Sequence, residues 1–268
     1  MAEAQGHQDE FDLLRSSIAA SDAARSATLQ AHEAELARAL MTSFTWSAPA
    51  LYVAEGPGRS RDINFNLAQL FLNCELDSNA SVTLAMQAYY KQASTTLRGV
   101  LELSLWASLF QPGGPVGPVG PGERTPWFKD LARDFLNGTA ARAYAGAFAT
   151  HPALAGLVSL DDTMALYSRL SKAPHNHPAA SNFKQWREEF QPTYDTEAFR
   201  RWVKDYRRVQ RCGLLWSALA FPLLYTWTRS SPHFLGKHGV AWDTVLTRSQ
   251  HRYLVRRSRP HERLKHLW

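Results

Sequence analysis

Apolar residues recur at helical spacing along most of this 268-residue chain, and no run shows the sustained apolar–polar alternation of strands. The clearest pattern spans residues 81–110, where apolar residues at steps of three and four predict a long helix capped by Ser81. We therefore expect a mainly α fold built as a bundle of long helices. The stripe consists of Met86, Tyr90, Ala93, Leu97, Leu101, Leu105 and Leu109.

Three further elements are expected before this helix. Residues 10–41 predict one long N-terminal helix, and its middle, which is poor in large apolar residues, favours a surface helix or an interaction arm over a core helix. Residues 47–62 are rich in proline and glycine and predict a loop with a short strand at 51–53. A second helix is expected over residues 63–76.

The second half of the chain is also interpreted as helical, with breaks at prolines. Residues 112–122, PGGPVGPVGPG, predict a loop between two helices of one bundle. Pro174 and Pro178 break the chain after one of these helices. The expected helices cover residues 126–137, 139–149, 160–173, 183–191 and 195–228, the last broken near Pro222.

Charge is distributed unevenly along the chain. Residues 200–268 hold 15 Lys and Arg and only three acids, a balance of +12, whereas residues 1–199 carry −6. A basic segment on a mildly acidic body indicates a polyanionic partner, most often nucleic acid. The pattern as a whole favours three segments: an N-terminal helix and loop (1–62), a helical bundle (63–190) and a basic C-terminal helical region (191–268).

Two basic stretches carry the candidate nucleic-acid contacts. Residues 200–211 predict a helix with a basic outer face, because Trp202, Tyr206 and Val209 supply one apolar flank. Residues 248–268 interleave arginines with aromatic residues, which suits phosphate contact and base stacking but equally a solvated helix that packs its leucines on the body. The predicted contact residues are Arg207, Arg208, Arg211, Arg252, Arg256, Arg257 and Arg259.

Composition narrows the class of protein. The N-terminus is polar and acidic and lacks the apolar core of a secretory signal. Two cysteines are too few for a disulfide framework or a zinc site, so we expect a cytoplasmic protein with reduced thiols and no metal or other cofactor. The apolar run at 212–227 is shorter than the roughly 20 residues of a membrane span and contains Pro222, so it favours a buried core helix, with membrane association as the weaker alternative.

A candidate reaction centre lies at residues 166–177, LYSRLSKAPHNH. Arg169 and His175 would point about 120° apart on a straight helix, but Pro174 ends the helix and lets the histidine turn back. Such a pair could cleave RNA without a metal, with the imidazole as general base on the 2′-OH and the guanidinium stabilising the phosphorane. The alternative is a chance spacing in a chain with 10 histidines, with a capping histidine and a solvated arginine.

The surroundings of this pair resemble the HEPN superfamily, in particular HEPN-like proteins of bacterial defence and toxin systems. The long predicted helix has Arg98 four residues before Glu102, and a later helix ends in the family-like pattern Tyr-x-x-Leu-Ser-x-x-x-His. The superfamily's ribonuclease signature, an arginine and a histidine separated by four to six residues, matches Arg169 and His175. The resemblance covers roughly residues 63–190.

This resemblance implies a bundle of four or five helices, often homodimeric, that acts as a metal-independent endoribonuclease in bacterial defence or as a toxin. Its partners would be RNA and an antitoxin or defence-system protein. Leu170, where many active members carry a polar residue, and the 112–122 loop depart from the family. They favour the alternative of a non-catalytic α-helical dimerisation or scaffold protein whose basic C-terminal part binds nucleic acid or an acidic partner. The implied site comprises catalytic Arg169 and His175, supported by Arg98, Glu102 and Asn176.

Overall fold

The computed structural model describes residues 2–55, 61–109, 160–172, 192–221, 224–225, 242 and 247–262. Within these residues all regular structure is helical, which confirms the mainly α prediction. The elements are α1 (Ala2–Ser43), η1 (Phe44–Trp46), α2 (Ser47–Glu55), α3 (Arg61–Met86), α4 (Tyr90–Leu109), α7 (Leu160–Ser171), α8 (Thr196–Ala220) and α11 (Arg248–Glu262).

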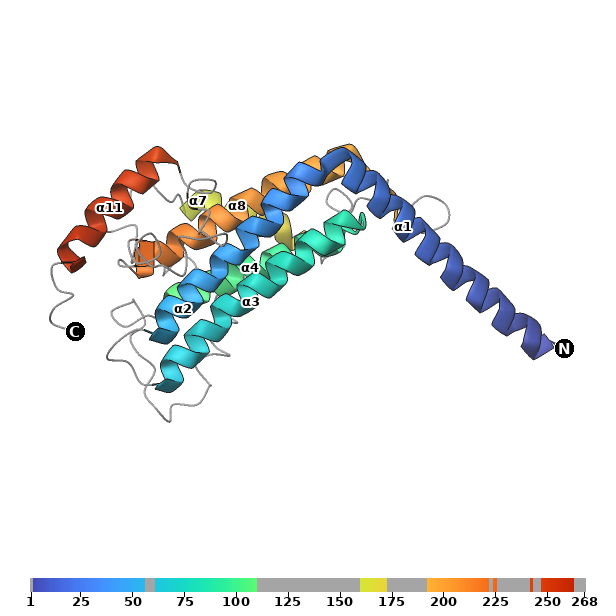
Figure 1. Ribbon diagram of the computed structural model, residues 1–268, viewed down its shortest axis with the longest axis horizontal. Helices are drawn as coiled ribbons and strands as arrows, with labels where there is room; N and C mark the ends of the chain where they lie inside the picture. The colour runs from blue at the N-terminus through green and yellow to red at the C-terminus, as the bar shows by residue number, and fades with distance from the viewer. Residues whose placement is uncertain are drawn as a thin grey trace.

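The helices form an elongated bundle from which one helix projects (Figure 1). α3 packs against α4, α4 packs against α7 and α8, and the second half of α1 lies along α3 and α8. The first half of α1 leaves the bundle as an arm, and α11 lies at the opposite end of the molecule. The predicted loop at 112–122 and the helices predicted at 126–137, 139–149 and 183–191 lie outside the described residues.

The long N-terminal helix is confirmed, but it bends. His32 has a non-helical backbone (φ −141°, ψ 26°) and divides α1 into two straight parts. Residues 10–16 are all exposed, whereas Leu36 and Ala39 beyond the bend are buried. Before the bend only the base of the arm, at Ala24 and Thr28, is buried, so the outer part of α1 is the surface helix or arm expected from the sequence.

The loop and strand predicted within residues 47–62 are wrong for 47–55, which form α2. Pro49 lies in the first turn of this helix, where its missing N–H costs no intrahelical hydrogen bond. Ala48, Ala50 and Val53 are buried and anchor α2 in the core. Proline at this point therefore begins a helix rather than a loop.

The predicted start of the next helix at Ser81 is also wrong. α3 continues to Met86 and ends in a Schellman motif, in which Ala88 is left-handed (φ 62°) and the Tyr89 N–H donates to the Leu84 carbonyl at 2.8 Å. Alanine occupies the position that usually holds glycine, so the sequence carries no visible stop signal there.

Ser81 instead links three helices within the core. It is fully buried, and its hydroxyl donates to the Ala93 carbonyl of α4 at 2.8 Å. The same oxygen accepts a hydrogen bond from the Trp202 indole of α8 at 3.0 Å. A buried hydroxyl with both a donor and an acceptor partner fixes the relative position of these helices.

α8 packs along α4 in the core and matches the helix predicted from residue 195. Asp195 caps it by accepting a hydrogen bond from the Ala198 N–H at 2.9 Å. Its predicted apolar flank is confirmed, because Trp202, Tyr206 and Val209 are at most 2% exposed. The described part of the apolar run at 212–227 is also largely buried, and no helix among the described residues is long and apolar enough to cross a membrane.

Gly213 allows α8 to approach its neighbours closely. A Cβ atom added there would lie 2.6 Å from the Ser104 hydroxyl of α4 and 2.7 Å from the Trp46 ring of η1. The Gln210 side chain, one turn earlier, is buried and joins the Trp46 indole to the Ser78 hydroxyl by hydrogen bonds. One core contains residues from Ala24 to Leu254, so all three segments defined from the sequence contribute to it.

Candidate nucleic-acid interface

The outer face of α8 carries a row of cations. With about 100° and 1.5 Å per helical residue, positions 200, 204, 207, 208 and 211 share one face over roughly 17 Å. These side chains are exposed, whereas Trp202, Tyr206 and Val209 on the opposite face are buried. The row consists of Arg200, Lys204, Arg207, Arg208 and Arg211.

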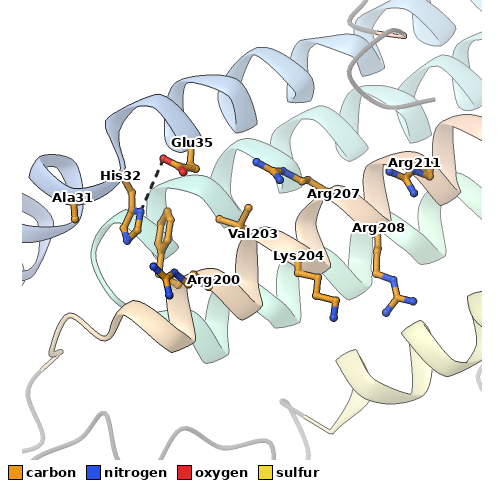
Figure 2. Close-up of a pocket in the computed structure, with 10 residues that line it drawn as sticks. Ala31, His32, Glu35, Arg200, Val203, Lys204, Arg207, Arg208 and Arg211 are labelled. Atoms are coloured by element: carbon orange, nitrogen blue, oxygen red, sulfur yellow. Dashed lines mark ion pairs between the residues drawn. The ribbon is translucent and has the colours of Figure 1, made fainter. Parts of the chain in front are cut away.

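A groove runs between this face and the second half of α1 (Figure 2). It has a volume of about 670 Å³ and is lined by all five cations of the row together with His32, Glu35 and Val203. A smaller hollow of about 330 Å³ continues along the same two helices past Arg38 and shares Glu35 and Val203 with it. We call the two together the α1–α8 groove; among its described lining residues, Glu35 is the only acid.

The arginines do not all point the same way. In Figure 2, Arg207 extends from α8 toward α1, whereas Arg208 extends toward the opposite side of α8, where α7 lies. Arg38 adds a cation from the α1 wall and approaches the Glu35 carboxylate at 4.0 Å. The α8 wall therefore has a strong excess of positive charge, while Arg38 and Glu35 balance each other on the α1 wall, and the net positive charge of the groove attracts anions and speeds their association.

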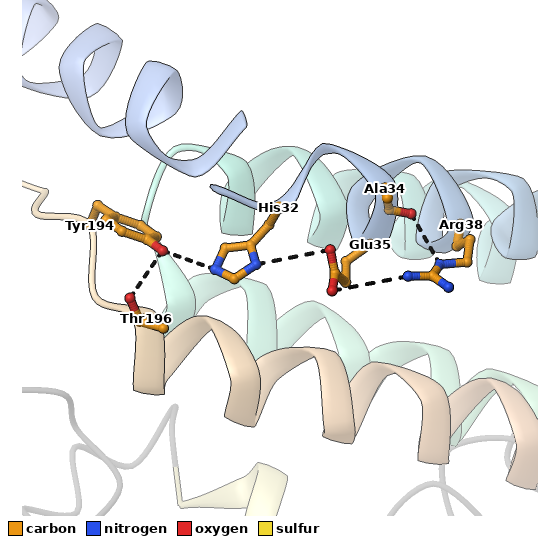
Figure 3. Close-up of polar contacts among 6 residues, drawn as sticks. All are labelled: His32, Ala34, Glu35, Arg38, Tyr194 and Thr196. Atoms are coloured by element: carbon orange, nitrogen blue, oxygen red, sulfur yellow. Dashed lines mark hydrogen bonds and ion pairs between the residues drawn. The ribbon is translucent and has the colours of Figure 1, made fainter. Parts of the chain in front are cut away.

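The bend of α1 at His32 lies beside the groove and is held by polar contacts (Figure 3). The His32 ring stacks on Phe199 with centroids 4.1 Å apart, and its Nε2 forms a 2.9 Å hydrogen bond with the Tyr194 hydroxyl. His32 Nδ1 lies 4.0 Å from the Glu35 carboxylate, and Thr196 donates to the same Tyr194 oxygen at 3.0 Å. These contacts join the bend to the beginning of α8 and so fix the separation of the two groove walls.

Arg98 and Glu102, predicted as supporting residues, form a closed polar triangle with Tyr167. Arg98 Nε donates to Glu102 at 2.8 Å, Tyr167 donates to the same carboxylate oxygen at 2.9 Å, and Arg98 donates to the Tyr167 hydroxyl at 3.0 Å. Burial and the Glu102 charge raise the pKa of Tyr167; burial lowers the pKa of Arg98, but Glu102 outweighs it and raises that pKa. The triangle ties α7 to α4.

Arg169, the predicted catalytic arginine, is paired with Asp205 of α8. Its Nε donates to one carboxylate oxygen at 3.1 Å and its terminal nitrogen donates to the other. The Arg169 side chain is 42% exposed and that of Asp205 only 15%. Burial raises the pKa of Asp205, although Arg169, Arg208 and Lys204 act in the opposite direction. Arg169 therefore lies beside the cations of the groove.

The other half of the predicted catalytic pair is not placed. His175 and Asn176 lie outside the described residues, so the structure neither joins them to Arg169 nor separates them from it. Leu170, which departs from the family pattern, is 1% exposed and packs in the core. Its apolar character is thus explained by packing at the bundle side of α7.

The predicted contacts on α11 form a second basic surface. Arg252 and Arg256 are exposed, while Leu254 on the same helix is buried against the body. The side chains of Arg257 and Arg259 are not among those that the structure describes. α11 lies at the end of the bundle away from the α1 arm (Figure 1), and its arginines do not line the α1–α8 groove.

Sequence reasoning missed part of the groove. Arg200 and Lys204 share the helical phase of Arg207 and Arg211, so the sequence contained a signal for them. Arg38 and His32 lie far away in the chain, and only the packing of α1 along α8 brings them to the groove.

Comparisons with known proteins leave the family open. No family model, no curated protein and no solved structure matches this chain at a significant level. No group of three or more His, Cys, Asp or Glu side chains in the described part of the chain could hold a metal ion. The HEPN resemblance therefore stays a prediction.

Proposed function

We propose that this protein binds RNA, with the phosphodiester backbone lying in the α1–α8 groove. The observation that supports this proposal is that five cations from one face of α8 line a single groove. Glu35 is the only acid among its described lining residues. Cations that neutralise phosphates release condensed counterions, and this release supplies much of the affinity for nucleic acid.

The chemistry of the row favours a ligand with repeated anionic groups, such as the phosphates of RNA, over a neutral or singly charged small ligand. Four of its five cations are arginines, whose planar guanidinium groups bind two phosphate oxygens at once and never lose their charge. Their spacing over roughly 17 Å suits a ligand with repeated charges rather than a single anion. The groove and the smaller hollow follow the same two helices and share Arg207 and Arg211, so the cations line a continuous stretch rather than a single point.

The proposal is tested by measuring RNA affinity with a fluorescent single-stranded oligonucleotide. Each lost charged hydrogen bond costs about 1.5 kcal/mol or more, so replacing Arg200, Arg207 and Arg211 with Gln should weaken binding at least about a hundredfold. The matched control replaces Arg15 and Arg25 of the α1 arm with Gln and should bind within about threefold of wild type. Unchanged binding by the groove variant, or equal displacement of RNA by polyglutamate, would contradict the proposal.

A second candidate function is metal-independent RNA cleavage by a HEPN-like site. The observation that favours it is the position of α7: the triangle with Arg98 and Glu102 fixes this helix, and Arg169 pairs with Asp205 beside the groove cations. RNA held by Arg208 would thus lie near Arg169. His175 would then act as general base on the 2′-OH, leaving a 2′,3′-cyclic phosphate and a 5′-OH.

Cleavage is separated from binding by one substitution. His175→Ala should abolish cleavage, measured from labelled RNA in the presence of a metal chelator, and should leave RNA affinity unchanged. The cellular toxicity expected of an active ribonuclease should disappear with it. Undiminished cleavage by this variant would reject the catalytic role, and a wild-type protein that binds RNA without cutting it would leave only the binding function.

A further inference from the structure

The smaller hollow of the α1–α8 groove gathers three arginines from its two walls. Arg207 and Arg211 lie one turn apart on α8, and Arg38 lines the hollow from α1. The Arg38 Nε donates to the Ala34 carbonyl at 3.1 Å, which anchors the guanidinium on its own helix (Figure 3). Like charges one turn apart on a helix repel each other, so a bound anion would stabilise this cluster.

Buried side chains form the floor of the hollow. Ala39 and Tyr206 line it and are at most 8% exposed, and the Tyr206 hydroxyl donates to the Ala39 carbonyl at 2.7 Å. Val203 adds a further apolar side chain. Charges that meet against apolar side chains interact more strongly than they do in water, so this floor strengthens the attraction between the arginines and an anion.

The space between α1 and α8 ends at this hollow. Gln210 lines the hollow and accepts a hydrogen bond from the indole of Trp46, which is fully buried and lies against α8 at Gly213. Beyond this point residues 213–218 of α8 are all buried, and the row of cations stops at Arg211. A strand that follows the row therefore finds neither a cation nor an open face of α8 after the hollow.

We propose that the hollow binds a terminal phosphate of the RNA strand, so that this site depends on the RNA binding proposed for the groove. An internal phosphodiester carries one negative charge, whereas a phosphate monoester carries about −1.5 to −2 at neutral pH. The charged side chains that line the hollow are three arginines and Glu35, so their net charge is +2. This charge matches the end group better than it matches an internal phosphate.

Oxygen count and size also favour an end group. A phosphate monoester presents three outer oxygens to the guanidinium groups, and an internal phosphodiester presents two. The hollow has a volume of about 330 Å³, at the small end of the range for ligand pockets. It suits one phosphate with part of its nucleotide, while the other phosphates lie along Arg200, Lys204 and Arg208 of the row.

The site is tested with three RNA oligonucleotides of one sequence and one internal fluorescent label. They end in a 5′-phosphate, in a 3′-phosphate or in hydroxyls alone. One of the two phosphorylated strands should bind at least about tenfold more tightly than the hydroxyl-ended strand, because the extra charge gains at least one charged hydrogen bond. Equal affinity for all three would overturn the terminal-phosphate site and leave the proposed RNA binding intact, whereas no binding of any strand would overturn both.

Two arginines make a matched pair of variants. Arg38 lines only the hollow, and Arg200 lines only the larger part of the groove. Arg38→Gln should reduce the preference for the phosphorylated strand to about threefold or less. Arg200→Gln should weaken the binding of both strands and keep their ratio within about twofold of the wild-type ratio, because it lies outside the hollow. An unchanged ratio in Arg38→Gln, or an equal loss of the ratio in both variants, would overturn the proposal.

A free mononucleotide carries the same phosphate monoester as the end of a strand. Adenosine monophosphate with its phosphate at the preferred position should bind at least about a hundredfold more weakly than the phosphorylated RNA, because it makes none of the contacts along the rest of the row. Calorimetric titration of the full chain measures this affinity. A mononucleotide that binds as tightly as the RNA would assign the hollow to free nucleotides and overturn its assignment to the RNA end.

Discussion

The two faces of α8 use the same helix for opposite purposes. The inner face buries Trp202, Tyr206 and Val209 among the neighbouring helices, while the outer face presents five cations to the α1–α8 groove. The inner face fixes where the helix lies, and this position decides which other residues the cations meet. Substitutions on the inner face should therefore change stability, and substitutions on the outer face should change binding.

The largest effect is expected from Trp202→Ala on the inner face. Loss of a fully packed indole costs about 3–5 kcal/mol, and the Ser81 hydroxyl also loses its donor. Urea denaturation should show this loss. Arg200→Ala on the outer face is the control and should change the free energy of unfolding by about 0.5 kcal/mol or less. A loss below about 1 kcal/mol for the tryptophan variant would break the distinction between the faces.

Gly213→Ala tests how closely the inner face approaches its neighbours. The new methyl group would meet Ser104 and Trp46 below 3 Å, so we expect a destabilisation of about 1–3 kcal/mol by thermal or urea unfolding. Gly99→Ala in α4 is the matched control. Its methyl group would meet only the Asp77 side chain at 2.9 Å, and the gain in helix propensity of about 1 kcal/mol should offset that contact. Equal losses in both variants would contradict the close packing.

Asp205 lies between the two faces, so its replacement should change both the free energy of unfolding and the RNA affinity. Asp205→Asn breaks the pair with Arg169 but removes a largely buried charge, so the unfolding free energy should change by about 1 kcal/mol or less. It also removes a negative charge beside the groove and releases Arg169, so RNA affinity should rise roughly threefold. Weaker RNA binding by this variant would contradict the account.

The pH dependence of RNA binding follows from the same residue. Burial raises the pKa of Asp205 above its ordinary value, so its carboxyl loses its charge at a higher pH than an exposed aspartate does. RNA affinity of the wild type should therefore increase as the pH falls through that pKa. The Asp205→Asn variant should lack this step, and a titration that is identical in both proteins would exclude Asp205 as its source.

An effect much smaller than that of the groove variant is expected from the arginines of α11. Arg252→Gln with Arg256→Gln removes two exposed charges outside the α1–α8 groove and should weaken RNA binding less than about fivefold. The same anisotropy assay used for the groove measures it. A loss as large as that of the groove variant would show that the two basic surfaces contribute equally.

Patterns confined to one helix could be predicted from the sequence. The apolar flank of α8 and the stripe that begins α4 at Tyr90 both follow from helical spacing, and the four-residue step of Arg98 and Glu102 gives their contact directly. The same helical spacing predicts the basic outer face of α8, because its cations occupy the positions opposite the apolar flank.

Features that depend on tertiary packing could not be predicted from the sequence. The α1–α8 groove exists because the bend at His32 directs α1 along α8. No local sequence pattern predicts the bend or the packing of these two helices. The pair between Arg169 and Asp205 joins residues 36 positions apart. The end of α3 could not be predicted, because alanine rather than glycine occupies the left-handed position at Ala88.

The central claim, that the groove cations contact RNA phosphates, is tested most directly by the salt dependence of binding. For single-stranded RNA, the logarithm of the binding constant falls with the logarithm of salt concentration by about 0.7 for each phosphate neutralised. Replacing Arg200, Arg207 and Arg211 with Gln should therefore reduce the slope of the wild type by about 2. An unchanged slope would show that these arginines do not contact the RNA backbone and would contradict the account.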